Sequence, residues 1–479
     1  MFTCIMSILI VIGVGFVIGE GMDMFVCPVR FLRRRSLFFL RSIPVLFSSS
    51  FFLVLTGSTP ISLLISAVLL GILVTASNLK LRLLNEPLVF TDFSLLGAFV
   101  RHPRFYLQGI PVFLRVVALT GGAFLVYLLI RASSAAMLPR YAGLAGTVIF
   151  AILLWVLVTR EGRINDEPPA LWDDVHNHGL LPVLMSYAVR CRSLPALSPR
   201  LPLPRAQGAP DAVIIVQCES FADPAELNAV WNSLPALTHY QNEAIQWGKL
   251  LPSGLGAYTM RSEYGVLCGD DEECLSYRLF DPFLTADQSP SHALPHRLKQ
   301  FYEKALFLHP YDIRFYGRDR MMPLWGFTDI VSRESFSDDD RVGPYVSDDA
   351  VADCLLKHLT ENERSLAYCV TIENHGPWKK GRLGRVSGEE AWYEHVRHSD
   401  AMLDKLVTGI RESGRDVLLV FFGDHRPALK ALPPIEGLER STPYVMLRPN
   451  DPRGRDVSSE PVDVTPAELH RSILRHVSS

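Results

Sequence analysis

The first third of the chain carries its excess of apolar residues, in segments that approach the length of a membrane-spanning helix. Five such segments are present: 4–18, 37–55, 61–76, 110–130 and 141–158. A helix needs about 20 apolar residues to cross the hydrocarbon layer. The sequence therefore predicts a five-helix transmembrane bundle over residues 1–160, followed by a soluble domain. The first segment lacks the basic start and the cleavage site of a signal peptide, so we interpret it as an uncleaved anchor.

Three further stretches define how the two parts are joined. Residues 78–106 are amphipathic and interrupted by Pro87, which predicts an interfacial or re-entrant segment. Residues 172–190 predict a helix on the membrane surface, and the proline-rich stretch 193–211 predicts a linker without regular structure. We therefore expect an interfacial and linker region over 161–210 and a catalytic domain over 211–479.

Within the soluble domain, apolar runs alternate with helix-like segments. The predicted strands are 213–217, 366–371, 417–422 and 444–447, and the predicted helices are 225–243, 291–303, 348–362 and 389–412. Strand and helix alternation of this kind predicts an α/β domain with a mainly parallel sheet. The run before Glu219 is apolar throughout, which is typical of a strand buried on both faces.

Charge and cysteine content exclude several classes of protein. The net charge is −3, so no overall positive field points to a nucleic-acid partner. Arginines cluster beside the apolar segments instead, as is typical next to anionic lipid. The 8 cysteines form no CxxC pair and no zinc-finger spacing, and they are too few for a disulfide scaffold in a chain of 479 residues.

Three of the predicted strands run into side chains that bind metals or move protons. The first ends at Glu219, the second leads into His375, and the third leads into Asp424 and His425. Ligands gather at the carboxyl ends of parallel strands, so we expect these side chains to lie together. Carboxylate and imidazole ligands suit zinc or manganese better than calcium.

Thr259 is the candidate nucleophile. It follows a loop that contains Gly254 and Gly256, and it stands where a helix is predicted to begin. A helix start attracts phosphate, and a hydroxyl beside a divalent cation is activated for attack on phosphorus. From the residues alone, an N-cap threonine with no catalytic role remains the alternative.

The order of these motifs resembles one family. VQCES at Glu219, the glycine loop before Thr259, FYGRD at 315–319, TIENHGPW at 371–378 and GDH at 423–425 together resemble the lipoteichoic-acid synthase and phosphoglycerol transferase family. That family lies within the sulfatase and alkaline-phosphatase superfamily. The five predicted spans and the NEPLVFTDF loop are also similar, so the resemblance covers nearly the whole chain.

The resemblance implies a role for each matching residue. The metal ligands would be Glu219, Thr259, Asp424 and His425, with Thr259 also the nucleophile. His375 would assist catalysis and contact the substrate, together with Arg318 and Tyr316. Arginine suits this role because a guanidinium binds phosphate oxygens at two points.

The resemblance further implies a membrane-bound, metal-dependent phosphoglycerol transferase. Glycerophosphate would move from phosphatidylglycerol to a cell-envelope glycan or glycolipid through a phospho-threonine intermediate. Manganese is the favoured cofactor, with zinc or magnesium as alternatives. The expected location is the bacterial inner membrane, with multiple spans and the catalytic domain on the periplasmic or extracellular side.

Charge counting favours the opposite orientation, because the arginine cluster at 30–35 would place the soluble domain in the cytoplasm. The resemblance outweighs this count. In an oxidising compartment, Cys268 and Cys274 would be able to close a small disulfide, with two buried thiols as the alternative.

Two other functions stay open at this stage. The first is a phosphoethanolamine transferase acting on lipid A or a glycan, or a related phosphodiesterase of the same superfamily. The second is a catalytically silent membrane protein that binds partners in glycan assembly. Sulfate-ester hydrolysis is disfavoured because Thr259-Met260-Arg261 does not supply the cysteine or serine motif that sulfatases convert to formylglycine.

Overall fold

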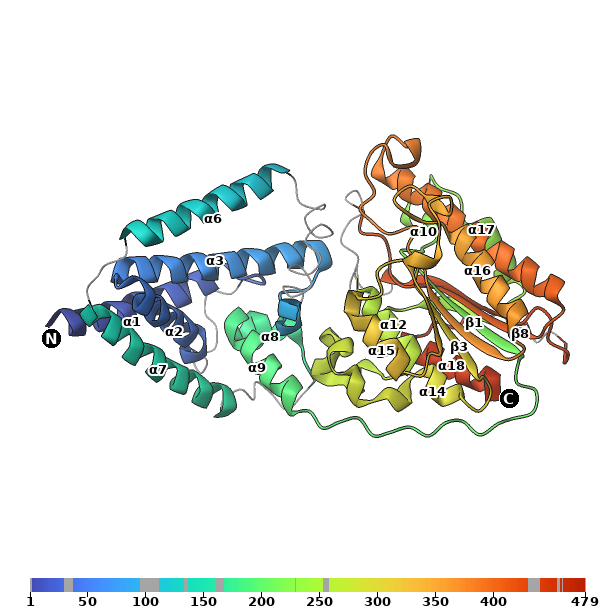
Figure 1. The fold of residues 1–479 in the computed structure, drawn as a ribbon, viewed down its shortest axis with the longest axis horizontal. Helices are drawn as coiled ribbons and strands as arrows, with labels where there is room; N and C mark the ends of the chain where they lie inside the picture. The colour runs from blue at the N-terminus through green and yellow to red at the C-terminus, as the bar shows by residue number, and fades with distance from the viewer. Residues whose placement is uncertain are drawn as a thin grey trace. The chain divides into compact units, whose positions relative to one another are not determined.

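The chain divides into two compact units, Met1–Leu194 and Pro195–Ser479 (Figure 1). The computed structural model describes residues 2–29, 38–94, 112–132, 137–160, 168–228, 230–252, 258–429, 440–454, 457–458 and 460–478. The arginine cluster at 30–35, the glycines of the loop before Thr259 and the stretch 95–106 lie outside these residues.

The first unit is helical. Its long helices are α1 (Phe2–Asp23), α2 (Phe38–Thr56), α3 (Thr59–Leu84), α6 (Val112–Ala132) and α7 (Met137–Arg160). Among the described residues, three helical segments are long and apolar enough to cross a membrane: Phe38–Thr56, Thr59–Arg82 and Met137–Thr159. The expectation of five spans is thus supported for three, while α1 and α6 occupy the positions of the other two.

Two predictions about the joining segments need correction. The amphipathic stretch from residue 78 does not begin a separate interfacial element, because α3 continues to Leu84. The single surface helix over 172–190 is wrong: the segment forms α8 (Leu171–His178) and α9 (Leu180–Ser193), which are separated at Gly179. Gly179 has a φ of +91°, a backbone angle that residues other than glycine rarely adopt.

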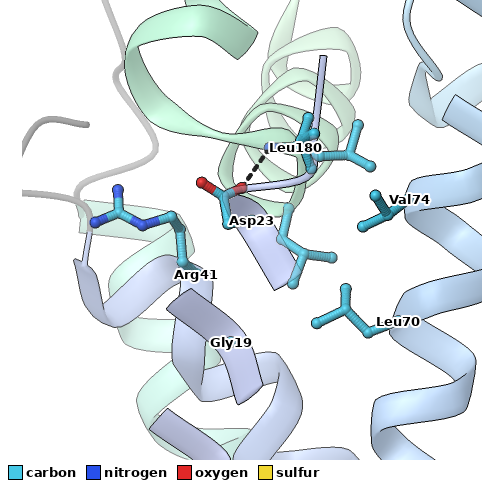
Figure 2. A pocket seen from close by; sticks show the side chains of 8 residues that line it. Gly19, Asp23, Arg41, Leu70, Val74 and Leu180 are labelled. Atoms are coloured by element: carbon cyan, nitrogen blue, oxygen red, sulfur yellow. Dashed lines mark hydrogen bonds between the residues drawn. The ribbon is translucent and has the colours of Figure 1, made fainter. Parts of the chain in front are cut away.

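Asp23 holds the start of α9. Its Oδ1 accepts a hydrogen bond of 3.3 Å from the Leu180 amide, one of the amides that a helix start leaves without a partner inside the helix (Figure 2). A Cβ at Gly179 would lie 2.4 Å from the same oxygen, so this approach requires glycine. The adjoining cavity, lined by Gly19 and Arg41 among others, encloses about 10 Å³ and has room for one water at most.

The second unit is built around one sheet of seven strands in the described part of the chain, in the order β2-β9-β8-β1-β7-β3-β4. The strands are β1 (Ala212–Cys218), β2 (Gln246–Leu250), β3 (Lys304–Leu308), β4 (Asp329–Val331), β7 (Ser365–Val370), β8 (Val417–Gly423) and β9 (Thr442–Leu447). Strands β8, β1, β7, β3 and β4 pair in parallel, and β9 pairs antiparallel with both β8 and β2. The predicted mainly parallel sheet is confirmed. A separate hairpin joins β5 (Arg341–Val342) to β6 (Tyr345–Val346).

Helices cover both faces of this sheet (Figure 1). Val213 and Ile215 of β1 pack in the same core as α12 (Thr259–Cys268), α14 (Leu294–Leu298), α15 (Arg318–Leu324) and α18 (Pro466–Ser478). Ile214 and Val216 face the opposite core, which includes α16 (Asp348–Glu361) and α17 (Gly388–Ser413). Because side chains alternate along a strand, an apolar run such as that of β1 supplies both cores.

Two of the four predicted helices are shorter than expected. The helix predicted over 225–243 is divided into α10 (Pro224–Leu227) and α11 (Pro235–Gln241), because Pro235 starts a new helix. The helix predicted over 291–303 is reduced to α14, which has a proline in its first turn. The predictions for α16 and α17 agree with the structure within a few residues.

The proline-rich segment from Pro195 to Pro210 has no regular secondary structure, as expected, and it runs along the second unit. Arg200 donates to the carbonyl oxygen of Cys268 at 2.8 Å and pairs with Asp270 at 2.6 Å. Leu197 and Leu203 pack against the core of that unit. This segment is therefore anchored to the sheet domain. Helix α13 (Glu272–Leu275) begins two residues after Asp270, the partner of Arg200.

Candidate active site

The carboxyl ends of β1 and β8 lie side by side. Cys218 at the end of β1 is in register with Gly423 at the end of β8. The next residues along the two strands are Glu219 and Asp424, so parallel pairing alone brings their carboxylates to one edge of the sheet. A Cβ at Gly423 would lie 2.0 Å from the carbonyl oxygen of Phe221, which shows how closely the loop after β1 approaches β8.

The Nε2 atom of His425 lies at the centre of a group of oxygen atoms. It is 3.4 Å from Oε1 of Glu219, 3.5 Å from Oδ2 of Asp424 and 3.3 Å from Oγ1 of Thr259. On the other side of the ring, Nδ1 lies 3.0 Å from the carbonyl oxygen of Arg426. A proton on Nδ1 donates to that oxygen and leaves the Nε2 lone pair directed at the cluster.

Burial and charge set the protonation of this group. Burial raises the pKa of Asp424, and the charge of Glu219 raises it further, to about 7. Burial alone would lower the pKa of His425, but the charges of Asp424 and Glu219 raise it. Burial opposes ionisation of Glu219, yet the charge of His375 and a hydrogen bond from His425 bring its pKa to about 2.

The donor set fits a divalent cation. Glu219, Asp424 and His425 each offer one ligand atom, and these atoms lie within 4.8 Å of one another. The Oδ2 atom of Asp424 is fully buried and accepts no hydrogen bond. Such an atom is costly in a protein interior unless a cation or another partner satisfies it. Two carboxylates, one imidazole and a nearby hydroxyl suit zinc or manganese.

Thr259 is the first residue of α12, as the sequence predicts. Its side chain does not cap the helix, so the N-cap alternative does not apply. The Gln217 side chain donates to the Thr259 carbonyl oxygen at 3.3 Å, and Ser262 of the same helix donates to the Asp424 carbonyl oxygen at 2.8 Å. These two bonds hold the start of α12 against the ends of β1 and β8.

The loop that begins at Glu219 is held in an uncommon conformation. Ser220 has a φ of +50°, which is rare for a residue other than glycine. Its amide donates to Oδ1 of Asp424 and its hydroxyl donates to Oε1 of Glu219, both at 2.9 Å. Backbone strain of this kind persists where the surroundings fix the loop, and it is frequent at functional sites.

His375 lies in the loop after β7 and is partly exposed. The Tyr345 hydroxyl is 3.5 Å from its Nδ1, and Arg382 donates to the backbone oxygens of His375 and Glu373 at 2.7 Å each. Tyr345 also lines a cavity of about 230 Å³, together with Tyr311, Asp312, Arg333, Glu334 and Arg341. His375 is therefore next to a cavity with polar and aromatic walls.

Arg318 is buried and already has a partner. Its Nε and one terminal nitrogen donate to the two carboxylate oxygens of Glu263, at 3.0 and 2.5 Å. Glu263 is four residues after Thr259 on α12, so the pair ties α15 to the helix that carries the candidate nucleophile. Tyr316 has a φ of +58°, and its ring centroid is 5.0 Å from the Arg318 guanidinium carbon.

Several residues near the site were not predicted from the sequence. His309 follows β3 and is buried. Burial and the charge of Arg318 lower its pKa to about 3, so it is neutral. Its position just after an apolar run was the available signal. Tyr311 and Tyr345 had no sequence signal of their own. A second group of side chains with the ligand types and spacing to hold a metal ion, Glu373 with His395 and His398, was also missed.

The possible disulfide between Cys268 and Cys274 is not formed. Both thiols are free, with Cys268 buried at the end of α12 and Cys274 exposed on α13. Burial raises the pKa of the Cys268 thiol well above its usual range. The alternative of two buried thiols is right for Cys268 and wrong for Cys274, which is exposed.

This chain is similar to several known proteins, some over little more than half of its length and one over most of it. A capsular polysaccharide biosynthesis protein of Rhizobium meliloti, RkpI, is 30 % identical over 314 residues, which are 64 % of this chain and 54 % of that protein. The chain spans about half the length of the curated relatives it matches. A phosphoglycerol transferase of Streptococcus pyogenes, GacH, is 18 % identical, with a TM-score of 0.48 over 57 % of this chain and 75 % of that structure.

A third match extends over both units. The integral membrane lipooligosaccharide phosphoethanolamine transferase A of Neisseria meningitidis is 12 % identical, with a TM-score of 0.54 over 90 % of this chain and 94 % of that structure. At this identity the match shows the fold alone, a helical unit followed by a sheet domain. The three helices that are long and apolar enough to cross a membrane all lie in the helical unit.

The model of one family covers more than half of the chain. The sulfatase family model matches residues 211–478, from the start of β1 to the end of α18. The matched region contains the predicted metal ligands, Thr259 and both cores of the sheet domain. The predicted superfamily is confirmed, and this chain belongs to the sulfatase family.

Proposed function

We propose that this chain is a metal-dependent phosphoglycerol transferase that moves glycerophosphate from phosphatidylglycerol to a cell-envelope glycan or glycolipid. The observation that carries the proposal is the position of Thr259. Its hydroxyl lies at the start of a helix and 3.3 Å from Nε2 of His425, beside two buried carboxylates. This arrangement provides a nucleophile, a cation site and a helix start that attracts phosphate.

Glu219, Asp424, His425 and Thr259 would hold the cation, with manganese favoured and zinc or magnesium as alternatives. When bound there, a divalent cation supplies positive charge that favours ionisation of a coordinated hydroxyl and offsets the charge of phosphate oxygens. Arg318 remains our proposed contact for the phosphoglycerol group, with Tyr316 beside it. Its two-point pair with Glu263 fixes the direction of its guanidinium.

The chain's own residues account for both halves of the reaction. Oγ1 of Thr259 releases its proton to solvent and forms a bond to phosphorus as the bond from phosphorus to the diacylglycerol oxygen breaks. His375 donates a proton to the departing diacylglycerol oxygen and then accepts the proton of the acceptor hydroxyl. The acceptor oxygen bonds to phosphorus as the bond from phosphorus to Oγ1 breaks, so that Thr259 regains a proton from solvent and glycerophosphate stays on the acceptor.

The cavity beside His375 fits a neutral, hydroxyl-rich group. Its two carboxylates already have partners, since Asp312 pairs with Arg314 at 2.6 Å and Glu334 accepts a hydrogen bond from Ser332. Tyr311 and Tyr345 add aromatic faces. The hydroxyls of glycerol or a sugar can form hydrogen bonds with such walls. The relative named for capsular polysaccharide biosynthesis supports a glycan acceptor.

Phosphoethanolamine transfer is the second candidate, because the fold match over 90 % of the chain is to a phosphoethanolamine transferase. For either donor, we place the sheet domain on the periplasmic or extracellular side of the bacterial inner membrane, where the lipid headgroups and envelope glycans meet.

A donor assay with the full chain in detergent micelles separates the two candidates. The protein is incubated with phosphatidylglycerol or phosphatidylethanolamine, each labelled in the headgroup and in the acyl chains. We expect diacylglycerol release from phosphatidylglycerol and retention of labelled glycerophosphate on the protein. Release from phosphatidylethanolamine alone would favour the second candidate, and release from neither lipid with any added metal would refute both.

A further inference from the structure

A second group of metal-ligating side chains lies apart from the Glu219 cluster. Glu373 follows β7, and His395 and His398 lie three residues apart on α17, so both histidines are on one face of that helix. Each offers one ligand atom, and the three atoms lie within 4.8 Å of one another. The Nδ1 atoms of His395 and His398 are 2.9 and 2.6 Å from the same atom, Oε1 of Glu373.

This group is largely buried and lies next to a second carboxyl group. Glu373 and His395 are essentially buried. The other oxygen of Glu373 accepts a hydrogen bond of 2.7 Å from the Asp348 amide, which places a second carboxylate close by. The Asp348 side chain is fully buried, and its Oδ1 has no hydrogen-bond partner. Two neighbouring carboxylates in an interior of low polarity are both ionised only beside a positive charge.

A divalent cation satisfies this requirement. Two neutral imidazoles and one carboxylate are ligands that zinc binds in many proteins. The side chain of His398 is 38 % exposed, so a cation can reach the group from solvent. A cation between the three atoms would replace two hydrogen bonds with three coordinate bonds and offset the charge of Asp348 and Glu373.

We propose that Glu373, His395 and His398 form a second divalent-cation site of the zinc type, which holds the loop carrying His375 against α17. Glu373 is two residues before His375 in that loop. Arg382 binds the backbone oxygens of both residues, so the position of Glu373 determines that of His375. The site is separate from the Glu219 cluster, and its existence does not depend on the donor lipid.

Counting zinc in the purified full-length protein tests this site. The protein is stripped with a chelator, dialysed against zinc and analysed by mass spectrometry for metal per chain. We expect His398→Gln to bind one zinc fewer than the wild type, and Glu219→Gln to keep the zinc that depends on His398. The control His239→Gln removes an exposed histidine of α11 and should bind as much zinc as the wild type.

A wild-type protein that binds no zinc would overturn the proposal, as would equal zinc content in the wild type and His398→Gln. X-ray absorption of the zinc-loaded Glu219→Gln variant reports the ligands of the bound zinc while Glu373, His395 and His398 are all left unchanged. Two imidazole ligands per zinc support the site, and fewer than two contradict it. Because zinc content and donor-lipid turnover are measured separately, failure of this proposal is distinguishable from failure of the transferase assignment.

Discussion

Arg318 and Glu263 form a buried two-point ion pair between α15 and α12, with side-chain exposures of 2 and 0 %. Removal of one charge leaves the other buried without a partner, which costs about 3–5 kcal/mol in comparable pairs. We therefore expect Glu263→Gln to lower the free energy of unfolding of the sheet domain by about 3 kcal/mol. Chemical denaturation followed by tryptophan fluorescence measures this change.

The same pair predicts a loss of activity. Lysine cannot reproduce the two-point geometry of a guanidinium, so Arg318→Lys should reduce diacylglycerol release even where the protein stays folded. Arg314→Lys is the matched control, because Arg314 lies in the same segment, is 65 % exposed and pairs with Asp312. Equal turnover in Arg318→Lys and Arg314→Lys would remove Arg318 from the proposed substrate site.

Thr259→Ala should reduce transfer by at least about a thousand-fold, as loss of a nucleophile does in other enzymes that act through a covalent intermediate. Thr259→Ser keeps a hydroxyl and should retain part of the activity. The measurement is diacylglycerol release from labelled phosphatidylglycerol, with Thr360→Ala as the control. Thr360 is exposed on α16, where its hydroxyl only donates to the Lys357 carbonyl oxygen. Turnover of Thr259→Ala near that of the wild type would exclude a threonine intermediate.

The residues that the sequence placed correctly follow strands buried on both faces. The apolar runs of β1, β7 and β8 are recognisable because both neighbouring cores require apolar side chains, and their ends indicate Glu219, His375, Asp424 and His425. A glycine-containing loop indicated that a helix begins at Thr259, whereas its proposed role came from the family resemblance.

Other elements depend on contacts that a single sequence does not display. Strand β4 is half exposed and only three residues long, so it has no apolar run. The break between α10 and α11 is stabilised by Asp400, which accepts hydrogen bonds from the amides of Ala236 and Leu237. The Glu373 group was missed because His395 and His398, three residues apart on an amphipathic helix, are not a metal signal by themselves. Their spacing acquires meaning only when β7 places Glu373 opposite them.

Metal removal should abolish transfer. Chelation of the full-length protein is expected to stop diacylglycerol release, and addition of manganese, zinc or magnesium one at a time should identify the metal that restores it. Glu219→Gln removes one proposed ligand and should weaken binding of the activating metal at least about 10-fold, because even residues that only support a ligand cost 10-fold or more. Glu361→Gln, at an exposed position on α16, is the control. Full activity of the chelated protein would argue against a metal-dependent mechanism.

Gly423→Ala tests how closely the loop after Glu219 approaches β8. The added Cβ would lie 2.0 Å from the Phe221 carbonyl oxygen and 2.9 Å from the Thr442 side chain. The Phe221 backbone on one side and Thr442 of β9 on the other cannot easily move away from the added methyl group. We therefore expect the free energy of unfolding to fall by about 1–3 kcal/mol. Since Asp424 is the next residue, the same change should also weaken metal binding, measured by metal content after dialysis. Gly71→Ala is the control, because a Cβ there has no neighbour within 4 Å. If Gly423→Ala matches the wild type in both unfolding and metal content, the loop and β8 do not approach as described, and the position of Glu219 beside Asp424 loses its support.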